Sequence, residues 1–188
     1  MEKGKKMPEN MIGQTENPKL LTIDELSALL APERPLVVAL DGVEDPANLG
    51  AIIRTVVAAG ATGVVIPERR AAGLSPAVAR AAAGALEHAK VARVPNLVRA
   101  LMDLKKSNLW VYGLEAGAPK SYTELDYAQG CVLLLGGEGR GLHRLVRETC
   151  DELAHIPLRG PVGSLNVSVA TGVVLYEAVR QRSQAGKA

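Results

Sequence analysis

The chain has 188 residues, of which 47% are hydrophobic and 22% are charged, so its composition is that of one folded domain and excludes a largely disordered chain. The formal net charge is only +2, which permits binding to nucleic acid without arguing for it. Aromatic residues make up 3%, with no phenylalanine, which argues against RNA-binding modules that stack bases on exposed rings.

Neither a membrane span nor a disulfide framework is expected. No apolar run reaches the roughly 20 residues that a span needs. The first residues, MEKGKKMPEN, lack the apolar core of a signal peptide. The two cysteines, Cys131 and Cys150, are too few for a disulfide scaffold and do not have the spacing of metal ligands. We therefore expect a cytoplasmic protein without a metal site.

The N-terminal residues 1–20 are polar, and we expect them to form a flexible tail ahead of one domain over residues 21–188. The sequence Thr22-Ile-Asp-Glu25 is typical of a capping box, in which the threonine oxygen and the glutamate carboxylate satisfy each other's backbone amides. It predicts a short helix that ends before Pro32.

Strands and helices are then expected to alternate along the chain. Short apolar runs predict strands over residues 36–40, 63–66, 91–94, 109–113, 131–135 and 153–156. Helices are predicted over residues 48–59, from Ser75-Pro76, from Asn96, over 142–149 and over 165–182. The polar side chains of Asn48, Ser75 and Asn96 favour N-cap positions. This alternation indicates the α/β class, with a mostly parallel sheet flanked by helices.

Ligands of such sheets bind beyond the carboxyl ends of the strands, which directs attention to residues 41–54, 113–118, 136–142 and 156–166.

Residues 136–141 read Gly-Gly-Glu-Gly-Arg-Gly between a predicted strand and a predicted helix. Neither the dinucleotide-binding pattern nor the phosphate-binding Walker A pattern fits this loop, which disfavours a nucleotide-dependent oxidoreductase. The glycines are compatible with a simple tight turn or with a backbone that approaches a ligand closely. A carboxylate at Glu138 would be a good acceptor for hydroxyl, amino or cationic groups, which favours the second interpretation.

Asn48 and Arg54 lie six residues apart in the segment after the first predicted strand. Six residues correspond to about 240° on a helix, so the two side chains share a site only if Asn48 precedes the helix proper. The alternatives are a helix cap for Asn48 and a solvated or ion-paired side chain for Arg54.

Ser164, Asn166 and Ser168 gather at the predicted start of the last helix, after an irregular loop rich in proline and glycine. Ser164 is a candidate N-cap there, and the three side chains with the free helix amides could also form a binding site.

The three histidines, His88, His143 and His155, lie in different segments without the spacing of metal ligands, so we expect surface or core positions for them. No nucleophile elbow is present, which disfavours hydrolysis by a catalytic triad. Cys131 lies within an apolar run and is expected in the core.

Three segments together resemble the three motifs of the SpoU (TrmH-like) branch of the SPOUT RNA methyltransferases. They read Asn48-Leu-Gly-Ala-Ile-Ile-Arg54, Leu135-Gly-Gly-Glu-Gly-Arg-Gly-Leu142, and Ile156-Pro-Leu158 followed by Ser164-Leu-Asn-Val-Ser168. The match runs from about Leu36 to Arg182. Three further stretches look like the subgroup that methylates a guanosine 2′-hydroxyl in 23S rRNA: Pro95-Asn-Leu97, Asp151-Glu-Leu153 and Glu177-Ala-Val-Arg-Gln-Arg182.

The resemblance implies an α/β SPOUT fold with a C-terminal trefoil knot, homodimers and S-adenosylmethionine as cofactor. It assigns cofactor binding to Leu114, Gly136, Gly137, Gly141, Ile156, Leu158 and Leu165. It assigns the catalytic work to Asn48, Arg54, Glu138, Ser164 and Asn166. Because a guanidinium is effectively always protonated, we expect Arg54 to anchor a phosphate and to stabilise the developing alkoxide rather than to act as a base. Glu138 and Asn166 would then orient the hydroxyl and the cofactor.

The implied function is 2′-O-methylation of RNA, with a guanosine of 23S rRNA as the first candidate acceptor and tRNA as the second. Members that act on rRNA carry an N-terminal RNA-binding domain of the ribosomal L30e type. Only about 35 residues precede the first predicted strand, so we expect a catalytic domain without that part. The alternative is a knotted module that binds cofactor or RNA with little activity.

Overall fold

The computed structural model of the chain describes residues 20–28, 30, 34–137 and 139–186. The predicted tail, residues 1–20, lies almost wholly outside the described residues, so its flexibility stays a prediction. Glu138 also lies outside them.

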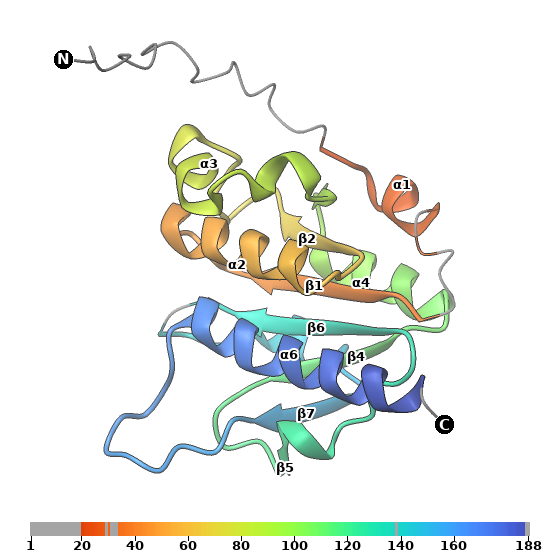
Figure 1. Ribbon diagram of the computed structural model, residues 1–188, viewed down its shortest axis with the longest axis vertical. Helices are drawn as coiled ribbons and strands as arrows, with labels where there is room; N and C mark the ends of the chain where they lie inside the picture. Colours follow the sequence, from red (N-terminus) through yellow and green to blue (C-terminus); the bar gives the residue numbers. More distant parts are fainter. Residues whose placement is uncertain (1–19, 29, 31–33, 138, 187–188) are drawn as a thin grey trace, which may run out of the picture.

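The described residues form a seven-stranded sheet in the order β3-β2-β1-β6-β4-β7-β5, in which all the pairings are parallel (Figure 1). The strands are β1 (Leu36–Asp41), β2 (Gly63–Pro67), β3 (Val91–Val94), β4 (Trp110–Leu114), β5 (Lys120–Ser121), β6 (Cys131–Gly136) and β7 (Glu152–His155). The six predicted strands are confirmed with small shifts at their ends. The short edge strand β5 was not predicted, because it contains no apolar run.

Helices cover both faces of this sheet. They are α1 (Ile23–Ala28), α2 (Pro46–Ala58), α3 (Pro76–Ala82), η1 (Ala85–His88), α4 (Leu97–Lys106), η2 (Tyr122–Glu124), α5 (Arg144–Arg147) and α6 (Val167–Ala185). Among the described residues, no helix combines the length and apolar character that a membrane span requires. The trefoil knot concerns the path of the chain through its C-terminal half and stays a prediction.

The two helical layers explain the apolar strand sequences. α2, α3 and α6 pack on the face of the sheet that carries Val38 and Leu133. α1, α4 and α5 pack on the opposite face, which carries Val37 and Val132. Every residue of β1 is buried as a result, so the strand needs the continuous apolar run that the sequence provides.

Two predicted helix starts are wrong, and both concern site residues. α2 is capped by Asp45, whose carboxylate accepts hydrogen bonds from the amides of Ala47 and Asn48 at 3.3 and 3.1 Å. Pro46 occupies the first helical turn, where its fixed φ suits the helix, so the helix begins earlier than predicted and Asn48 lies inside it. α6 is capped by Asn166 and not by Ser164.

Three other predicted helix starts are confirmed, those of α1, α3 and α4. Ser75 and Asn96 cap α3 and α4 as predicted, and Thr22 and Glu25 form the predicted capping box. α5 is a single short turn, shorter than the predicted helix over residues 142–149.

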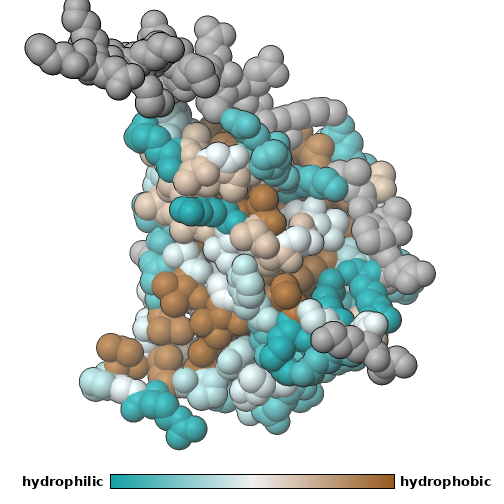
Figure 2. Space-filling model, in the orientation of Figure 1, coloured by the Kyte–Doolittle hydropathy of each residue, from teal (hydrophilic) through white to brown (hydrophobic). Residues whose placement is uncertain are grey.

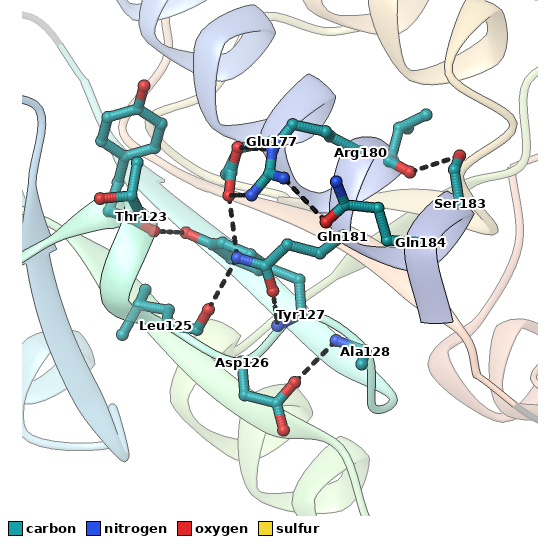
Figure 3. Close-up of polar contacts among 12 residues, drawn as sticks. Thr123, Leu125, Asp126, Tyr127, Ala128, Glu177, Arg180, Gln181, Ser183 and Gln184 are labelled. Atoms are coloured by element: carbon teal, nitrogen blue, oxygen red, sulfur yellow. Dashed lines mark hydrogen bonds and ion pairs between the residues drawn. The ribbon is translucent and has the colours of Figure 1, made fainter. Parts of the chain in front are cut away.

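The C-terminal half of α6 is held by polar side chains that bond to loop backbone (Figure 3). The amide group of Gln181 donates to the carbonyl of Leu125 and accepts from the amide of Tyr127, both at 3.1 Å. The guanidinium of Arg182 donates to the carbonyls of Tyr127, Gln129 and Arg34, at 2.8, 2.7 and 2.6 Å. These contacts tie the helix to the segments that lead into β6 and β1.

Both cysteines pack against the hydrophobic core. Cys131 is fully buried in β6, as predicted, and burial raises the pKa of its thiol to about 12. Burial also raises the pKa of Cys150 to about 11.

Two glycines give a matched test of helix packing. A Cβ on Gly50 in α2 would lie 2.4 Å from the Cβ of Ala81 and 2.7 Å from the carbonyl oxygen of Val78, so α2 and α3 approach closely only without a side chain there. We expect Gly50→Ala to lower the free energy of unfolding by about 1–3 kcal/mol. The control is Gly73→Ala, an exposed position with nothing within 4 Å of a Cβ and no positive φ, where we expect a change of less than about 0.5 kcal/mol. Urea denaturation followed by circular dichroism measures both, and equal effects would contradict this account of the packing.

Candidate active site

A cavity of about 630 Å³ opens at the carboxyl edge of the sheet, where segments far apart in sequence meet. We call it the first cavity. Its walls come from the ends of β4 and β6, the loops after β4, β6 and β7, and the start of α6. They comprise Leu114, Glu115, Ala116, Leu135, Gly136, Gly137, Gly139, Arg140, Gly141, Ile156, Leu158, Gly163, Ser164, Leu165, Asn166, Val167 and Ala170.

All the residues predicted to bind the cofactor line the first cavity. They are Leu114, Gly136, Gly137, Gly141, Ile156, Leu158 and Leu165. Ser164 and Asn166, predicted to be catalytic, line it as well. The structure thus brings residues of the second and third sequence motifs together on the wall of one cavity.

The glycine-rich loop is shaped by close backbone contacts. A Cβ on Gly136 would lie 2.2 Å from the carbonyl carbon of Gly141, and one on Gly137 would lie 1.9 Å from the carbonyl oxygen of Gly42. Gly139 and Gly141 adopt positive φ angles of +80° and +64°, with nothing within 4 Å of their missing side chains. The loop is therefore a tight turn, as the first interpretation has it, and its backbone also lines the cavity. Its close approach to a ligand stays a prediction.

The first cavity is mainly apolar with a few charged groups. Leu114, Ile156 and Leu158 supply apolar walls. Glu115 lies on the wall and accepts a hydrogen bond from Nε of Arg147 at 2.7 Å, and this bond raises the pKa of the arginine. Among the described residues, no group of histidine, cysteine, aspartate and glutamate side chains is placed to hold a metal ion.

Asn48 and Asn166 connect the first motif to the third. Nδ2 of Asn166 donates to Oδ1 of Asn48 at 3.0 Å, and Oδ1 of Asn166 accepts from the amide of Ser168 at 2.9 Å. Asn166 thus caps α6 and fixes the side chain of Asn48 at the same time. The contact forms although Asn48 lies within α2, because the start of α6 packs against that helix.

Of the predicted site residues that the structure describes, Arg54 is the one that lines neither the first cavity nor a second cavity beside it, and Asn48 lines only the second. Arg54 is exposed on α2. The sequence predicts a shared site for Asn48 and Arg54 only if Asn48 precedes the helix. Asn48 lies inside α2, so the two side chains point in different directions. The next residue, Thr55, lies 3.8 Å from the position of a Cβ on Gly172, which places Arg54 close to α6.

A second cavity of about 570 Å³ lies beside the first and shares Gly137, Arg140, Gly141 and Val167 with it. Its other walls are Asp41, Gly42, Val43, Glu44, Asp45, Asn48, Arg70 and His143. The sequence did not predict that the side chains of Asp41, Arg70 and His143 line a common cavity. Asp41 could have been noticed at the end of a buried strand, whereas nothing in the sequence links Arg70 to His143.

Comparisons of the sequence and of the fold with known proteins all lead to the same family. Residues 35–176 match the SpoU rRNA Methylase family. The 23S rRNA (guanosine-2'-O-)-methyltransferase RlmB of Xanthomonas campestris pv. campestris is 50% identical over 166 residues, which cover 87% of this chain and 67% of that protein. The chain spans between about half and two thirds of the length of the curated relatives it matches.

Solved structures agree with the sequence match. The SpoU methyltransferase AviRb from Streptomyces viridochromogenes, in complex with the cofactor AdoMet, has a TM-score of 0.78 and 32% identity, over 86% of this chain and 66% of that one. The TrmH/SpoU tRNA modifying enzyme of A. aeolicus has a TM-score of 0.73 and 31% identity, over 87% of this chain and 84% of that one. The chain therefore belongs to the SpoU rRNA methylase family.

Proposed function

We propose that the chain transfers a methyl group from S-adenosylmethionine to a ribose 2′-hydroxyl of RNA, and that a guanosine of 23S rRNA is the acceptor. The observation that carries the proposal is the first cavity, in which the second and third family motifs form one continuous wall. The AdoMet complex of AviRb and the name of RlmB support the donor and the acceptor, respectively. The tRNA modifying enzyme of A. aeolicus makes tRNA the second candidate acceptor.

The first cavity fits S-adenosylmethionine in size and chemistry. Its volume of about 630 Å³ lies within the usual range of small-molecule pockets. Apolar side chains such as Ile156 and Leu158 suit the flat adenine ring, and the glycine-rich loop leaves room for it. Glu115 and Arg140 are available for the charged amino and carboxyl groups of the methionine part. When bound, the cofactor supplies a methyl group activated by a positive sulfur.

The residues of the chain hold and orient the acceptor. Asn166 and Asn48, joined by their hydrogen bond, lie between the two cavities and would hold the hydroxyl beside the donor. We expect Arg54 to bind a phosphate and to stabilise the developing negative charge on oxygen. Glu138 keeps its predicted role in orienting the hydroxyl.

A homodimer would bring Arg54 of one copy to the cavity of the other copy. Apolar side chains gather over the N-terminal half of α6 and the loop before it (Figure 2). Val162, Leu165, Val169 and Tyr176 are all exposed there, and Leu165 also lines the first cavity. We infer that a second copy covers this apolar patch, so that the interface adjoins the cavity and Arg54 of one copy serves the site of the other.

The proposed function predicts binding and transfer by the same cavity. We expect S-adenosylmethionine to bind in calorimetry, and tritiated methyl groups to pass to unmodified 23S rRNA fragments more readily than to tRNA. Ala116→Trp, an exposed wall position, should lower the cofactor affinity by about tenfold or more because the ring fills the cavity. Ala185→Trp at the far end of α6 is the control. Binding without transfer to any RNA would favour the module with little activity.

Arg54→Ala should lower the rate of methyl transfer by about 100-fold and leave the cofactor affinity near that of the wild-type chain. Arg80→Ala on α3 is the control, since Arg80 is exposed and lines neither cavity. An equal loss of transfer and cofactor binding would mean that Arg54 has a structural role.

Mixing the Arg54→Ala and Ala116→Trp chains tests whether Arg54 acts across the interface. A mixed dimer then holds one site with an intact cavity and an intact arginine, and we expect about a quarter of the wild-type rate from random pairing. No recovery would place Arg54 in the site of its own chain.

The apolar patch predicts a dimer that charge disrupts. We expect Val169→Asp combined with Tyr176→Asp to convert a dimer into a monomer in sedimentation equilibrium, because two carboxylates would be buried without partners. Met102→Asp is the control, since Met102 is equally exposed, at 52%, on the other side of the sheet. A wild-type monomer would contradict the prediction.

A further inference from the structure

The second cavity contains a connected group of charged side chains that the proposed function leaves without a role. Oδ1 of Asp41 lies 3.0 Å from Nδ1 of His143, and Oδ2 accepts a hydrogen bond from the backbone amide of His143 at 2.7 Å. Nη1 of Arg70 lies 3.5 Å from Nε2 of the same ring. Three segments distant in sequence therefore meet on one wall.

The contact with Asp41 fixes which ring nitrogen of His143 carries the proton. Asp41 is only 6% exposed, and as a carboxylate it accepts hydrogen bonds, so Nδ1 must be the donor. In the neutral ring Nε2 then keeps its lone pair. The guanidinium of Arg70 has only donors to offer, so its approach to Nε2 fits the same tautomer. At 3.5 Å this contact is long, and Arg70 must turn toward a phosphate before Nε2 can accept a proton from a hydroxyl.

The wall of the second cavity therefore carries the imidazole of His143, which can accept a proton, beside the guanidinium groups of Arg70 and Arg140. The charged groups around the imidazole are Asp41 at the end of β1, Arg70 after β2, Arg140 in the glycine-rich loop, and Glu44 and Asp45 before α2. The carboxylate of Asp45 is already engaged by the amides at the start of α2. A hydroxyl next to a phosphate is the chemical group that matches a hydrogen-bond acceptor next to a guanidinium, and a ribonucleotide carries this combination at its 2′ and 3′ positions.

The two cavities are contiguous. Gly137, Arg140, Gly141 and Val167 line both of them, so a nucleotide in the second cavity would adjoin a ligand in the first. The side chain of His143 is 35% exposed, which leaves the ring accessible from the cavity.

We propose that the second cavity receives the acceptor nucleotide, that the imidazole of His143 accepts the proton of its ribose 2′-hydroxyl, and that Arg70 binds the adjoining 3′-phosphate. This inference rests on the proposed function. The O2′–H bond breaks and its proton passes to Nε2, while an electron pair of O2′ forms the bond to the methyl carbon and the pair of the broken C–S bond stays on sulfur. Asp41 is a positioning residue, which holds the ring and stabilises the imidazolium until its proton passes to water.

Turnover tests the proton acceptor. We expect His143→Ala to lower kcat by about 100-fold or more, with KM for RNA raised by no more than about tenfold and the cofactor affinity changed by less than about threefold. Added imidazole should restore at least about tenfold of the loss, since the truncated side chain leaves room for it. Asp41→Asn should lower kcat by about tenfold or more without changing KM, because the ring loses its fixed tautomer. His88→Ala is the control, on an exposed turn remote from both cavities.

Nucleotide binding without the methyl donor gives an independent readout. Ring proton signals of the three histidines are followed by NMR in the full chain, and His143→Asn identifies the signal of interest. Guanosine 3′-monophosphate should move the His143 signal and leave that of His88 in place. The 2′-deoxy nucleotide should bind about threefold more weakly or worse, because it lacks the hydroxyl that donates to Nε2. Arg70→Gln should weaken both nucleotides alike.

The possible outcomes distinguish a failure of this inference from a failure of the proposed function. If the wild-type chain methylates RNA and His143→Ala keeps kcat within about threefold, the inference is wrong and the proposed function stands. If the wild-type chain methylates no RNA, the proposed function fails, and the nucleotide titration decides the inference alone. A His143 signal that does not respond, or equal affinity for both nucleotides, overturns it.

Discussion

The carboxyl edge of the sheet depends on the close approach of two backbone segments, the glycine-rich loop after β6 and the end of β1. The amide of Gly137 donates to the carbonyl of Asp41 at 2.7 Å, and no side chain fits between Gly137 and the carbonyl of Gly42. This contact sets the path of the loop, so that one strip of backbone forms a wall of both cavities. It also brings the backbone amide of His143 to the carboxylate of Asp41.

Most of the fold could be predicted because its determinants are local. Strands buried on both faces need continuous apolar runs, and β1 and β6 have them. The errors arose where two local signals compete. Asp45, Pro46 and Asn48 all favour a helix start, and the proline decides the register, which moved Asn48 into the helix. β5 has no local signal, since it is held only by its pairing with β7.

The site could be predicted only in part. The wall of the first cavity follows from motifs at strand ends, because parallel strands deliver their following loops to the same edge. The contact between Arg70 and His143 could not be predicted, because the two residues are 73 positions apart and neither belongs to a recognisable pattern. For Arg54 the sequence is more informative than the structure of the single chain. Its motif marks it as functional, yet in the single chain it is exposed on α2 and lines neither cavity.

The anchoring of α6 links the far end of the molecule to the first cavity. The helix begins at the Asn166 cap on the first cavity and ends in the loop contacts of Gln181 and Arg182. Nineteen residues of helix span about 28 Å. The helix is therefore fixed at its distal end, and fraying of its last turn during heating would loosen the wall of the first cavity before the sheet itself melts.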